Sequence, residues 1–182
     1  MSDLVLPEGK LVALRPVTAA DANERYLRWL NDPEVVKHLE TVPQPYTMEM
    51  LKQYIAGVIG HPGNYFFMLI DKSTGREIGT MRLHNVNRHH GTCNIGIMIG
   101  ERDLQGKGFG TDAYHTGIRF AFESLGLRKI WEAVNARNTA SLAMFARLGF
   151  EEEGRWKAHV RTADGFDDKI LLSLFSERFL QT

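Results

Sequence analysis

Along this chain the spacing of apolar residues changes from helical in the first quarter to strand-like in the middle. Tyr26, Trp29 and Leu30 lie three or four positions apart, like one face of a helix. Residues 65–70 are almost wholly apolar and residues 10–16 alternate, which is typical of strands. The pattern predicts helices at 22–30, from Pro33, at 48–59, 111–125 and 138–148, and strands at 10–16, 65–70, 77–84, 92–99, 129–134, 151–160 and 169–175.

Short polar motifs set the predicted helix ends. Thr18 with Asp21 three residues later resembles a capping box for the first helix. Asp32 before Pro33 predicts an N-cap and first position for the second helix. The apolar side of that helix would be formed by Val35, Val36 and Leu39.

The order of these elements predicts an α/β (α+β) fold. An antiparallel meander fills the middle of the chain, and strands and helices alternate in the second half. We therefore expect a mixed, mostly antiparallel sheet with helices on both faces.

The glycine-rich segment 103–111 follows the predicted strand 92–99 and opens a predicted helix. Gly106, Gly108 and Gly110 allow positive φ and leave the backbone N–H groups accessible beside the positive end of that helix. This arrangement suits a phosphate group. The spacing matches neither a P-loop nor a dinucleotide fingerprint, and a purely structural turn is the alternative.

Composition indicates an ordinary globular protein. The 182 residues include 22 basic and 22 acidic side chains, so the formal net charge is zero and offers no whole-domain match to nucleic acid. The single cysteine, Cys93, excludes an internal disulfide. With no long apolar span and no signal-like start, we expect a soluble cytoplasmic protein without membrane attachment.

Two blocks of sequence resemble the GNAT superfamily of acyl-CoA-dependent N-acyltransferases. Residues 105–110, Gln-Gly-Lys-Gly-Phe-Gly, are similar to its pyrophosphate loop, and residues 135–150 are similar to its second cofactor block. Residues 14–16, 29–35 and 153–154 resemble the branch of ribosomal-protein N-terminal, polyamine and nucleotide-amino-sugar acetyltransferases, the amino-sugar enzymes most. The resemblance implies one N-acetyltransferase domain over residues 1–182, with the cofactor between two splayed parallel strands.

The resemblance implies acetyl-CoA as co-substrate. The pyrophosphate would lie on the glycine loop, the pantetheine arm along the strand before it, and the helix 138–148 would line the channel. A backbone N–H of the strand would face the thioester oxygen and stabilise the charge that develops there. The residues placed at the cofactor by this resemblance are Ile97, Met98, Ile99, Gln105, Gly106, Lys107, Gly108, Phe109, Gly110, Thr111, Asn138, Ser141 and Phe145.

The catalytic side chains depart from the family pattern. Phe145 replaces the tyrosine often used as proton donor, and Asn94 replaces a glutamate frequent in the strand before the loop. Ser141 is a substitute donor, since some relatives use the serine at that position. A primary amine of pKa near 10 costs roughly 4 kcal/mol to deprotonate at pH 7. His84, His159 and Glu34 are the candidate bases.

The acceptor pocket is expected in the first half of the chain. Its candidate residues are Trp29, Asn31, Tyr46, His84 and Arg155. The expected acceptor is a small amine such as a nucleotide-linked amino sugar, with a protein N-terminus or a polyamine as alternatives and a non-catalytic acyl-CoA-binding module as the alternative of another class. The adjacent His89 and His90 are too few for a metal site, so we expect no metal. The oligomeric state stays open, a homodimer included.

Overall fold

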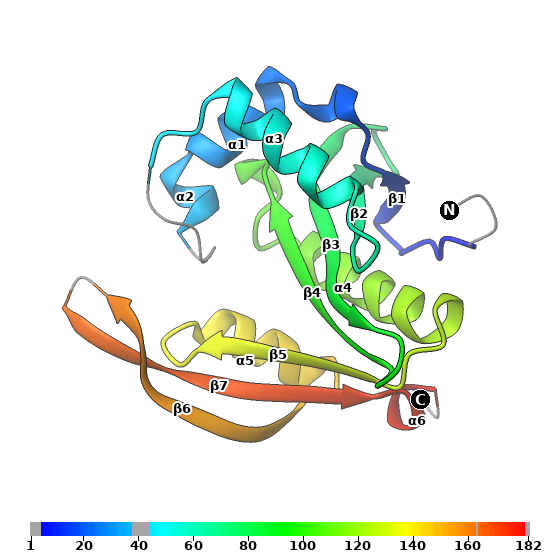
Figure 1. Cartoon of the computed structure of the whole chain (residues 1–182), viewed down its shortest axis with the longest axis vertical. Coiled ribbons are helices and arrows are strands. Elements are labelled where there is room, and N and C mark those ends of the chain that lie inside the picture. The colour runs from blue at the N-terminus through cyan, green and yellow to red at the C-terminus, as the bar shows by residue number, and fades with distance from the viewer. Residues whose placement is uncertain (1–4, 38–43, 163, 181–182) are drawn as a thin grey trace.

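In the computed structural model, which describes residues 5–37, 44–162 and 164–180, seven strands form one sheet in the order β1-β2-β3-β4-β5-β7-β6 (Figure 1). The strands are β1 (Val12–Pro16), β2 (Tyr65–Asp71), β3 (Glu77–Asn87), β4 (Thr92–Ile99), β5 (Lys129–Asn135), β6 (Glu151–Thr162) and β7 (Gly165–Phe175). All neighbours pair antiparallel except β4 and β5, which are parallel. The predicted mixed sheet and its central meander are confirmed.

Helices cover both faces of the sheet, as predicted. They are α1 (Glu24–Asn31), α2 (Pro33–Val36), α3 (Met48–Ile59), α4 (Phe109–Arg119), α5 (Thr139–Arg147) and α6 (Ser176–Phe179), and a π-helical segment, Phe120–Ser124, continues α4. The helices α1 to α3 pack on one face and α4 and α5 on the other. The helix 48–59 and the strand 92–99 have the predicted bounds.

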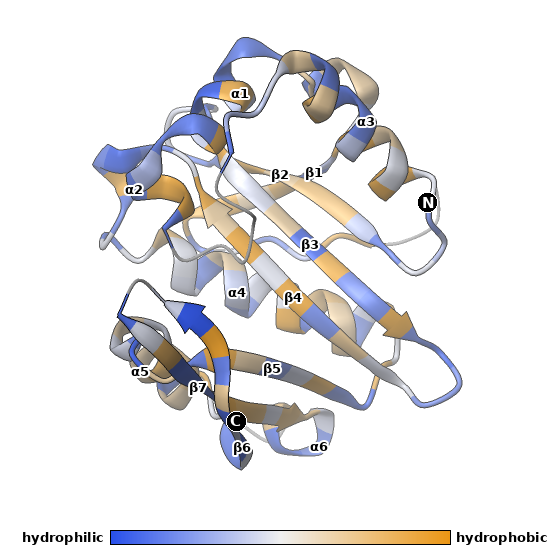
Figure 2. Cartoon of the chain, turned by 60° about the vertical axis from the view of Figure 1, so that its left-hand side comes forward, coloured by the Kyte–Doolittle hydropathy of each residue, from blue (hydrophilic) through white to orange (hydrophobic). Residues whose placement is uncertain are grey.

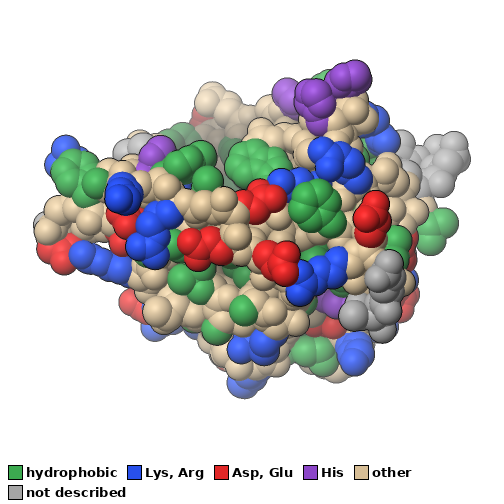
Figure 3. All heavy atoms as spheres, turned by 90° about the horizontal axis from the view of Figure 1, so that it is seen from below, with side chains coloured by type: hydrophobic (Ala, Val, Ile, Leu, Met, Phe, Trp, Pro, Cys, Tyr) green, Lys and Arg blue, Asp and Glu red, His purple; other side chains and the backbone are tan. Residues whose placement is uncertain are grey.

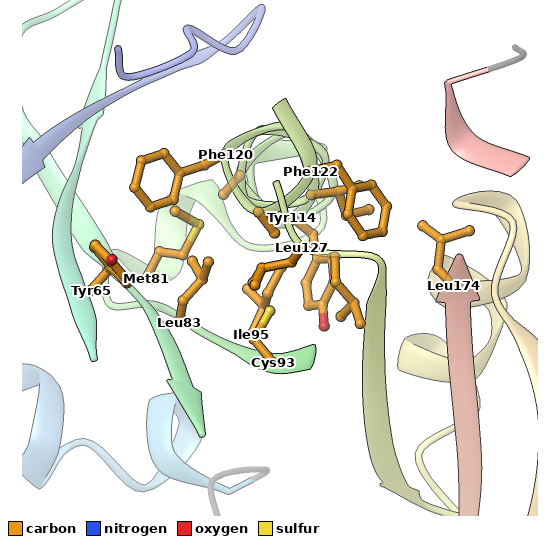
Figure 4. Packing of buried hydrophobic residues seen from close by; sticks show 14 of the residues in the cluster. Tyr65, Met81, Leu83, Cys93, Ile95, Tyr114, Phe120, Phe122, Leu127 and Leu174 are labelled. Carbon is orange, nitrogen blue, oxygen red and sulfur yellow. The ribbon is translucent and has the colours of Figure 1, made fainter. Parts of the chain in front are cut away.

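The apolar run in β2 faces both layers of helices. Phe66 and Met68 belong to the core under α1 to α3, whereas Phe67 and Leu69 belong to the core under α4. Successive side chains of a strand point to opposite faces, so a strand covered on both sides is continuously apolar. Apolar residues accordingly gather on the central strands (Figure 2), and Phe120 lies deep in the α4 layer (Figure 4).

β4 and β5 form a fork. Their pairing is limited to Thr92 with Lys129 and Cys93 with Ile130, at the start of both strands. Beyond these pairs the two strands diverge, which is visible in Figure 1. The splayed parallel pair that the sequence resemblance implied is therefore present, and its closed end lies at Cys93 and Ile130.

The first helix begins later than predicted. The box of Thr18 and Asp21 is formed, but it caps a 3-10 turn, Ala19–Asp21, and Asn23 caps α1 by accepting from the N–H of Tyr26. The Asp21 carboxylate also binds Arg15, which ties it to β1. Asp32 and Pro33 start α2 as predicted. Leu39 lies outside the described residues.

Other boundaries differ by a few residues. α4 begins at Phe109 instead of Thr111, and β3, β6 and β7 are longer than their apolar patterns. The extensions are polar hairpin ends, where backbone pairing continues past the buried residues.

Surface charge is mixed. Basic and acidic side chains are interspersed on the face in Figure 3, and neither sign forms a continuous patch there. No helix in the described part of the chain has the length and apolar character that a membrane span requires.

Candidate active site

A cavity of about 660 Å³ opens in the fork between β4 and β5. Its walls come from α1, α3, the segment before α3 and strands β2 to β7. Six aromatic side chains line it, and these are Tyr26, Tyr46, Tyr54, Phe66, Trp131 and Trp156. Among the described residues that line it, the charged or titratable polar groups besides the tyrosines are Arg82, His84, Glu132 and Lys169.

The glycine loop lies at the open end of the fork, between β4 and α4. Gly106 and Gly108 have φ of 73° and 89°, the left-handed region that favours glycine. The backbone N–H groups of five residues have no acceptor within the described part of the chain, and these residues are Gly106, Gly108, Phe109, Gly110 and Thr111. Unpaired N–H groups at the start of a helix form a site for a phosphate group. The loop therefore fits the diphosphate of acetyl-CoA.

Two predicted loop residues already have partners. The N–H of Lys107 donates to the carbonyl of Leu104 at 3.4 Å, so this residue offers the loop its exposed ammonium rather than its amide. The side-chain amide of Gln105 donates to the carbonyl of Ile99 at 3.3 Å. Gln105 thus joins the loop to the end of β4.

The loop is anchored at both ends. Trp29 packs on Gly100, where a Cβ atom would lie 2.1 Å from the indole ring, and its Nε1 donates to Glu101 at 3.2 Å. On the helix side, the carboxylate of Asp112 accepts the backbone N–H groups of Lys10, Leu11 and Val12 at 2.8–2.9 Å. These contacts fix the loop against α1 and the start of β1.

Backbone amides of β4 face the fork at alternate positions. The N–H of Ile95 donates to Glu132 of β5, and that of Gly100 donates to β3. Because successive amides of a strand point to opposite sides, the amides of Ile97 and Ile99 point into the fork and that of Met98 points to β3. The Met98 side chain still lines the cavity. Ile97 is thus placed to offer the oxyanion contact.

The second predicted cofactor block forms the start of α5. Asn138 caps this helix by accepting the N–H of Ser141 at 3.1 Å. Phe145 is buried, and its ring centroid lies 4.9 Å from that of Tyr114. None of these three α5 residues is among the described residues that line the cavity. Ser141 and Asn138 keep their expected roles as predictions.

Of the candidate bases, His84 lies in the cavity. Burial, with Arg82 nearby, lowers the pKa of His84 to about 4, so its imidazole is neutral at physiological pH. His159 is exposed on β6 and stacks on Trp156 at 4.6 Å between ring centroids. Glu34 is exposed and forms an ion pair with Lys37 at 2.8 Å. Of the three candidate bases, the structure therefore places His84 in the fork.

The candidate acceptor-binding residues also divide into those that line the cavity and those that lie outside it. Tyr46 and His84 line the cavity. Trp29 and Asn31 lie one layer behind it, Trp29 against the loop and Asn31 against the backbone of Tyr46. Arg155 forms an ion pair with Asp168 at 3.3 Å on the outer hairpin.

At the closed end of the fork, the sequence prediction missed Glu132 and named Asn94 only as a departure from the family pattern. Asn94 is buried and donates to the carbonyl of Trp131, which links β4 to β5. Glu132 accepts the N–H of Ile95 at 2.7 Å and the hydroxyl of Tyr114 at 2.5 Å. One signal was available, a glutamate inside the apolar strand 129–134, because a carboxyl group is rarely placed among apolar strand residues without a partner.

Comparison with known proteins agrees with this geometry. The profile described as "Acetyltransferase (GNAT) domain" matches residues 12–151. The spermidine N(1)-acetyltransferase of Escherichia coli K12 is 24% identical over 176 residues, covering 96% of this chain and 91% of that protein. The [ribosomal protein uS5]-alanine N-acetyltransferase of the same organism is 32% identical over 110 residues, covering 54% and 56%.

Solved structures share the fold. The crystal structure of spermidine N-acetyltransferase from Vibrio cholerae in complex with CoA and spermine superposes with a TM-score of 0.84 at 20% identity, covering 93% of this chain and 98% of that one. The acceptors that these names state are a polyamine and the alanine of a ribosomal protein, whereas the acceptor first expected from the sequence was a nucleotide-linked amino sugar.

Proposed function

Because this chain belongs to the GNAT family of acetyltransferases and takes its acetyl group from acetyl-CoA, we propose that its acceptor is a weakly basic primary amine, first of all a peptide N-terminus. The observation that carries the proposal is the makeup of the cavity in the fork. Its described walls are aromatic, with two cations and a single carboxyl group.

The charges argue against a polyamine. Arg82 lines the cavity without an ion pair to a described residue, and Glu132 is the one carboxylate or carboxylic acid among the described lining residues. A polyamine carries several ammonium groups, and like charges in a poorly hydrated cavity repel one another by several kcal/mol. An acceptor with one amine avoids most of this cost.

The basicity of the acceptor points the same way. A peptide α-amine has a pKa near 8, so forming its nucleophilic state at pH 7 costs roughly 1.4 kcal/mol, against roughly 4–5 kcal/mol for a lysine-like amine. The candidate base in the cavity is His84, whose pKa of about 4 makes it a weak proton acceptor. Such a site suits an amine that needs little help to lose its proton.

The residues divide the work as follows. The free N–H groups of the glycine loop would hold the diphosphate, and the N–H of Ile97 would polarise the thioester carbonyl. Tyr46 and the other aromatic walls would orient the acceptor so that its nitrogen meets the carbonyl carbon. His84 would accept a hydrogen bond from the amine, directly or through water.

A nucleotide-linked amino sugar is the second candidate. Arg82 has no ion pair with any described residue, and an Arg side chain binds phosphate groups well. The phosphates of such a substrate would meet the guanidinium group of Arg82.

A competition assay tests the proposal. The protein is given acetyl-CoA with an alanine-initiated peptide, a nucleotide-linked amino sugar or spermidine, and thiol release and acetylated product are measured. We expect the largest kcat/KM with the peptide. The same peptide with a blocked N-terminus is the matched control and should give no product. A larger kcat/KM with spermidine would overturn the proposal.

A further inference from the structure

The carboxyl group of Glu132 lies at the closed end of the fork, where the two cofactor strands separate. Its Oε1 atom accepts two hydrogen bonds, from the N–H of Ile95 on β4 and from the hydroxyl of Tyr114 on α4. Figure 4 shows Tyr114 beside Cys93 and Ile95. Glu132 also lines the cavity. The roles proposed above for other residues do not explain why a carboxyl group is placed here.

The two oxygens of this carboxyl group are not equivalent. Both hydrogen bonds go to Oε1, and none from a described residue goes to Oε2. A protonated carboxyl group has one O–H donor and keeps acceptor capacity on its other oxygen. With two donors directed at Oε1, the proton of the neutral acid belongs on Oε2, where it remains available for donation.

The surroundings favour the protonated form. Burial raises the pKa of Glu132 to about 8, and its two hydrogen bonds only partly oppose the rise. The groups packed on it, Tyr114 and Cys93, are neutral because burial raises their pKa values as well. Glu132 is therefore an acid at neutral pH.

Charged groups face Glu132 from the other strands as well. Arg82 and His84 of β3 and Lys169 of β7 line the same cavity. On the outer side of β5, Lys129 is bound to Glu153 of β6 at 2.7 Å. The cations would ease ionisation of Glu132, and they stabilise the carboxylate once its proton has left.

The reaction needs a proton at this end of the fork. The arm of acetyl-CoA, with its diphosphate on the glycine loop, would follow β4 back from Ile99 toward Ile95. Phe145 occupies the position of the family's usual donor, and its ring is in edge contact with Tyr114, the residue that holds Glu132. Tyr114 thus connects the carboxyl group of Glu132 with the position at which the family's usual tyrosine is replaced.

We propose that Glu132 is the proton donor to the coenzyme A thiolate released by acetyl transfer. The amine nitrogen forms the C–N bond and the C–S bond breaks. The thiolate takes the proton of Glu132, and the carboxylate that remains is held by Ile95 and Tyr114. The proton lost by the amine passes to water, and water returns one to Glu132, so no proton is gained or lost overall.

The inference rests on acetyl transfer, and not on the identity of the acceptor. The test is Glu132→Gln, which keeps an oxygen for Ile95 and Tyr114 but removes the acidic proton. We expect a fall in kcat of about 100-fold, with unchanged binding of coenzyme A by calorimetry. In the wild type, kcat should decline above about pH 8 as the acid ionises, and the variant should lack this decline.

Three further variants separate chemistry from structure. Glu152→Gln is the matched control. Glu132 on β5 and Glu152 on β6 pair with the same residue of β7, Leu172, but Glu152 is exposed. This variant should therefore behave as the wild type. Adding Phe145→Tyr to Glu132→Gln should restore part of kcat. Ser141→Ala tests the serine that the sequence analysis predicted as proton donor. In this variant kcat should still decline at alkaline pH, as in the wild type.

A spectroscopic readout is independent of turnover. The infrared difference spectrum between the wild type and Glu132→Gln should contain the carbonyl band of a protonated carboxyl group at neutral pH, lost at alkaline pH. Absence of that band, or a Glu132→Gln enzyme with wild-type kcat and pH profile, would overturn the inference. If the wild type acetylates no amine, the proposed function fails, while the band still decides whether Glu132 holds a proton.

Discussion

The side chain of Asn31 forms two hydrogen bonds with the backbone of Tyr46. Its Oδ1 atom accepts the N–H of Tyr46 at 2.8 Å, and its Nδ2 atom donates to the carbonyl of the same residue at 2.9 Å. Asn31 ends α1, whereas Tyr46 precedes α3 and lines the cavity. An asparagine outside the cavity therefore positions an aromatic residue within it.

Replacing this asparagine should weaken acceptor binding. In Asn31→Ala the segment before α3 loses both bonds, and Tyr46 loses its fixed position. We expect KM for the amine to rise several-fold while KM for acetyl-CoA stays the same, because the glycine loop is anchored elsewhere. Steady-state kinetics with each substrate varied in turn measure both values. Gln53→Ala, which removes an exposed amide of α3 that donates to Glu49 in the same helix, is the control and should change neither value.

The case of Asn31 shows how far the sequence could predict the acceptor site. Trp29 and Asn31 were predicted as substrate contacts because the predicted cofactor elements occupy the second half of the chain, which leaves the acceptor pocket to the first half. The structure places both in supporting positions, against Gly100 and Tyr46. Sequence spacing identifies a helix face but not which neighbour that face meets, since this depends on tertiary packing.

The glycine loop gives a second prediction. A side chain at Gly108, where φ is 89°, would strain the backbone by roughly 1–2 kcal/mol and shift the free N–H groups next to it. We expect Gly108→Ala to raise KM for acetyl-CoA at least tenfold, with a smaller effect on KM for the amine. Gly57→Ala is the matched control, because Gly57 lies in α3 with open space around its Cβ position. It should stabilise the protein by roughly 0.5–1 kcal/mol and leave KM unchanged.

Most of the fold could be predicted because periodicity and turn chemistry agreed. The amphipathic helix 48–59 and the strand 92–99 have clear patterns and clear ends, and the predicted bounds of both were correct. Errors arose where two polar residues competed for one role, as Thr18 and Asn23 did for the start of α1. Glu132 was missed for another reason: the partners of its carboxyl group come from β4 and α4, far away in sequence.

Glu132 should also make stability depend on pH. Its folded pKa of about 8 lies above the ordinary 4.5, so the folded state keeps a proton that the unfolded state has lost. The stabilisation is complete below pH 4.5 and is lost as pH rises through about 8, at up to about 1.4 kcal/mol per pH unit. Glu132→Gln should therefore gain stability relative to the wild type as pH rises. Urea unfolding of both proteins across this range measures the difference, and parallel curves would contradict it.

His84 should have the opposite dependence. Its pKa falls from 6.5 to about 4 on folding, so between these pH values the unfolded state binds a proton that the folded state does not bind. Stability is complete above pH 6.5 and is lost as pH falls through about 4, by about 3 kcal/mol at most. His84→Gln should lose less stability on acidification than the wild type. His89→Gln, in the exposed turn between β3 and β4, is the control and should follow the wild-type curve.

The charge of the cavity gives the last prediction. Arg82 projects into the cavity from β3, has no ion pair with a described residue, and lies near enough to His84 to lower its pKa. Arg82→Glu would therefore replace the repulsion of a polycation by attraction and make His84 a stronger base. We expect KM for spermidine to fall and KM for an acidic peptide to rise, both effects shrinking at high salt as screening grows.

A neutral replacement separates charge from shape. Arg82→Gln should move both KM values in the same directions by smaller amounts, because it removes repulsion without adding attraction. Arg161→Glu is the control, since Arg161 is exposed on β6 over the ring of Phe166 and away from the cavity lining. If Arg82→Glu leaves the preference between spermidine and peptide unchanged, the cations of the fork do not select the acceptor, and the case against a polyamine loses its electrostatic basis.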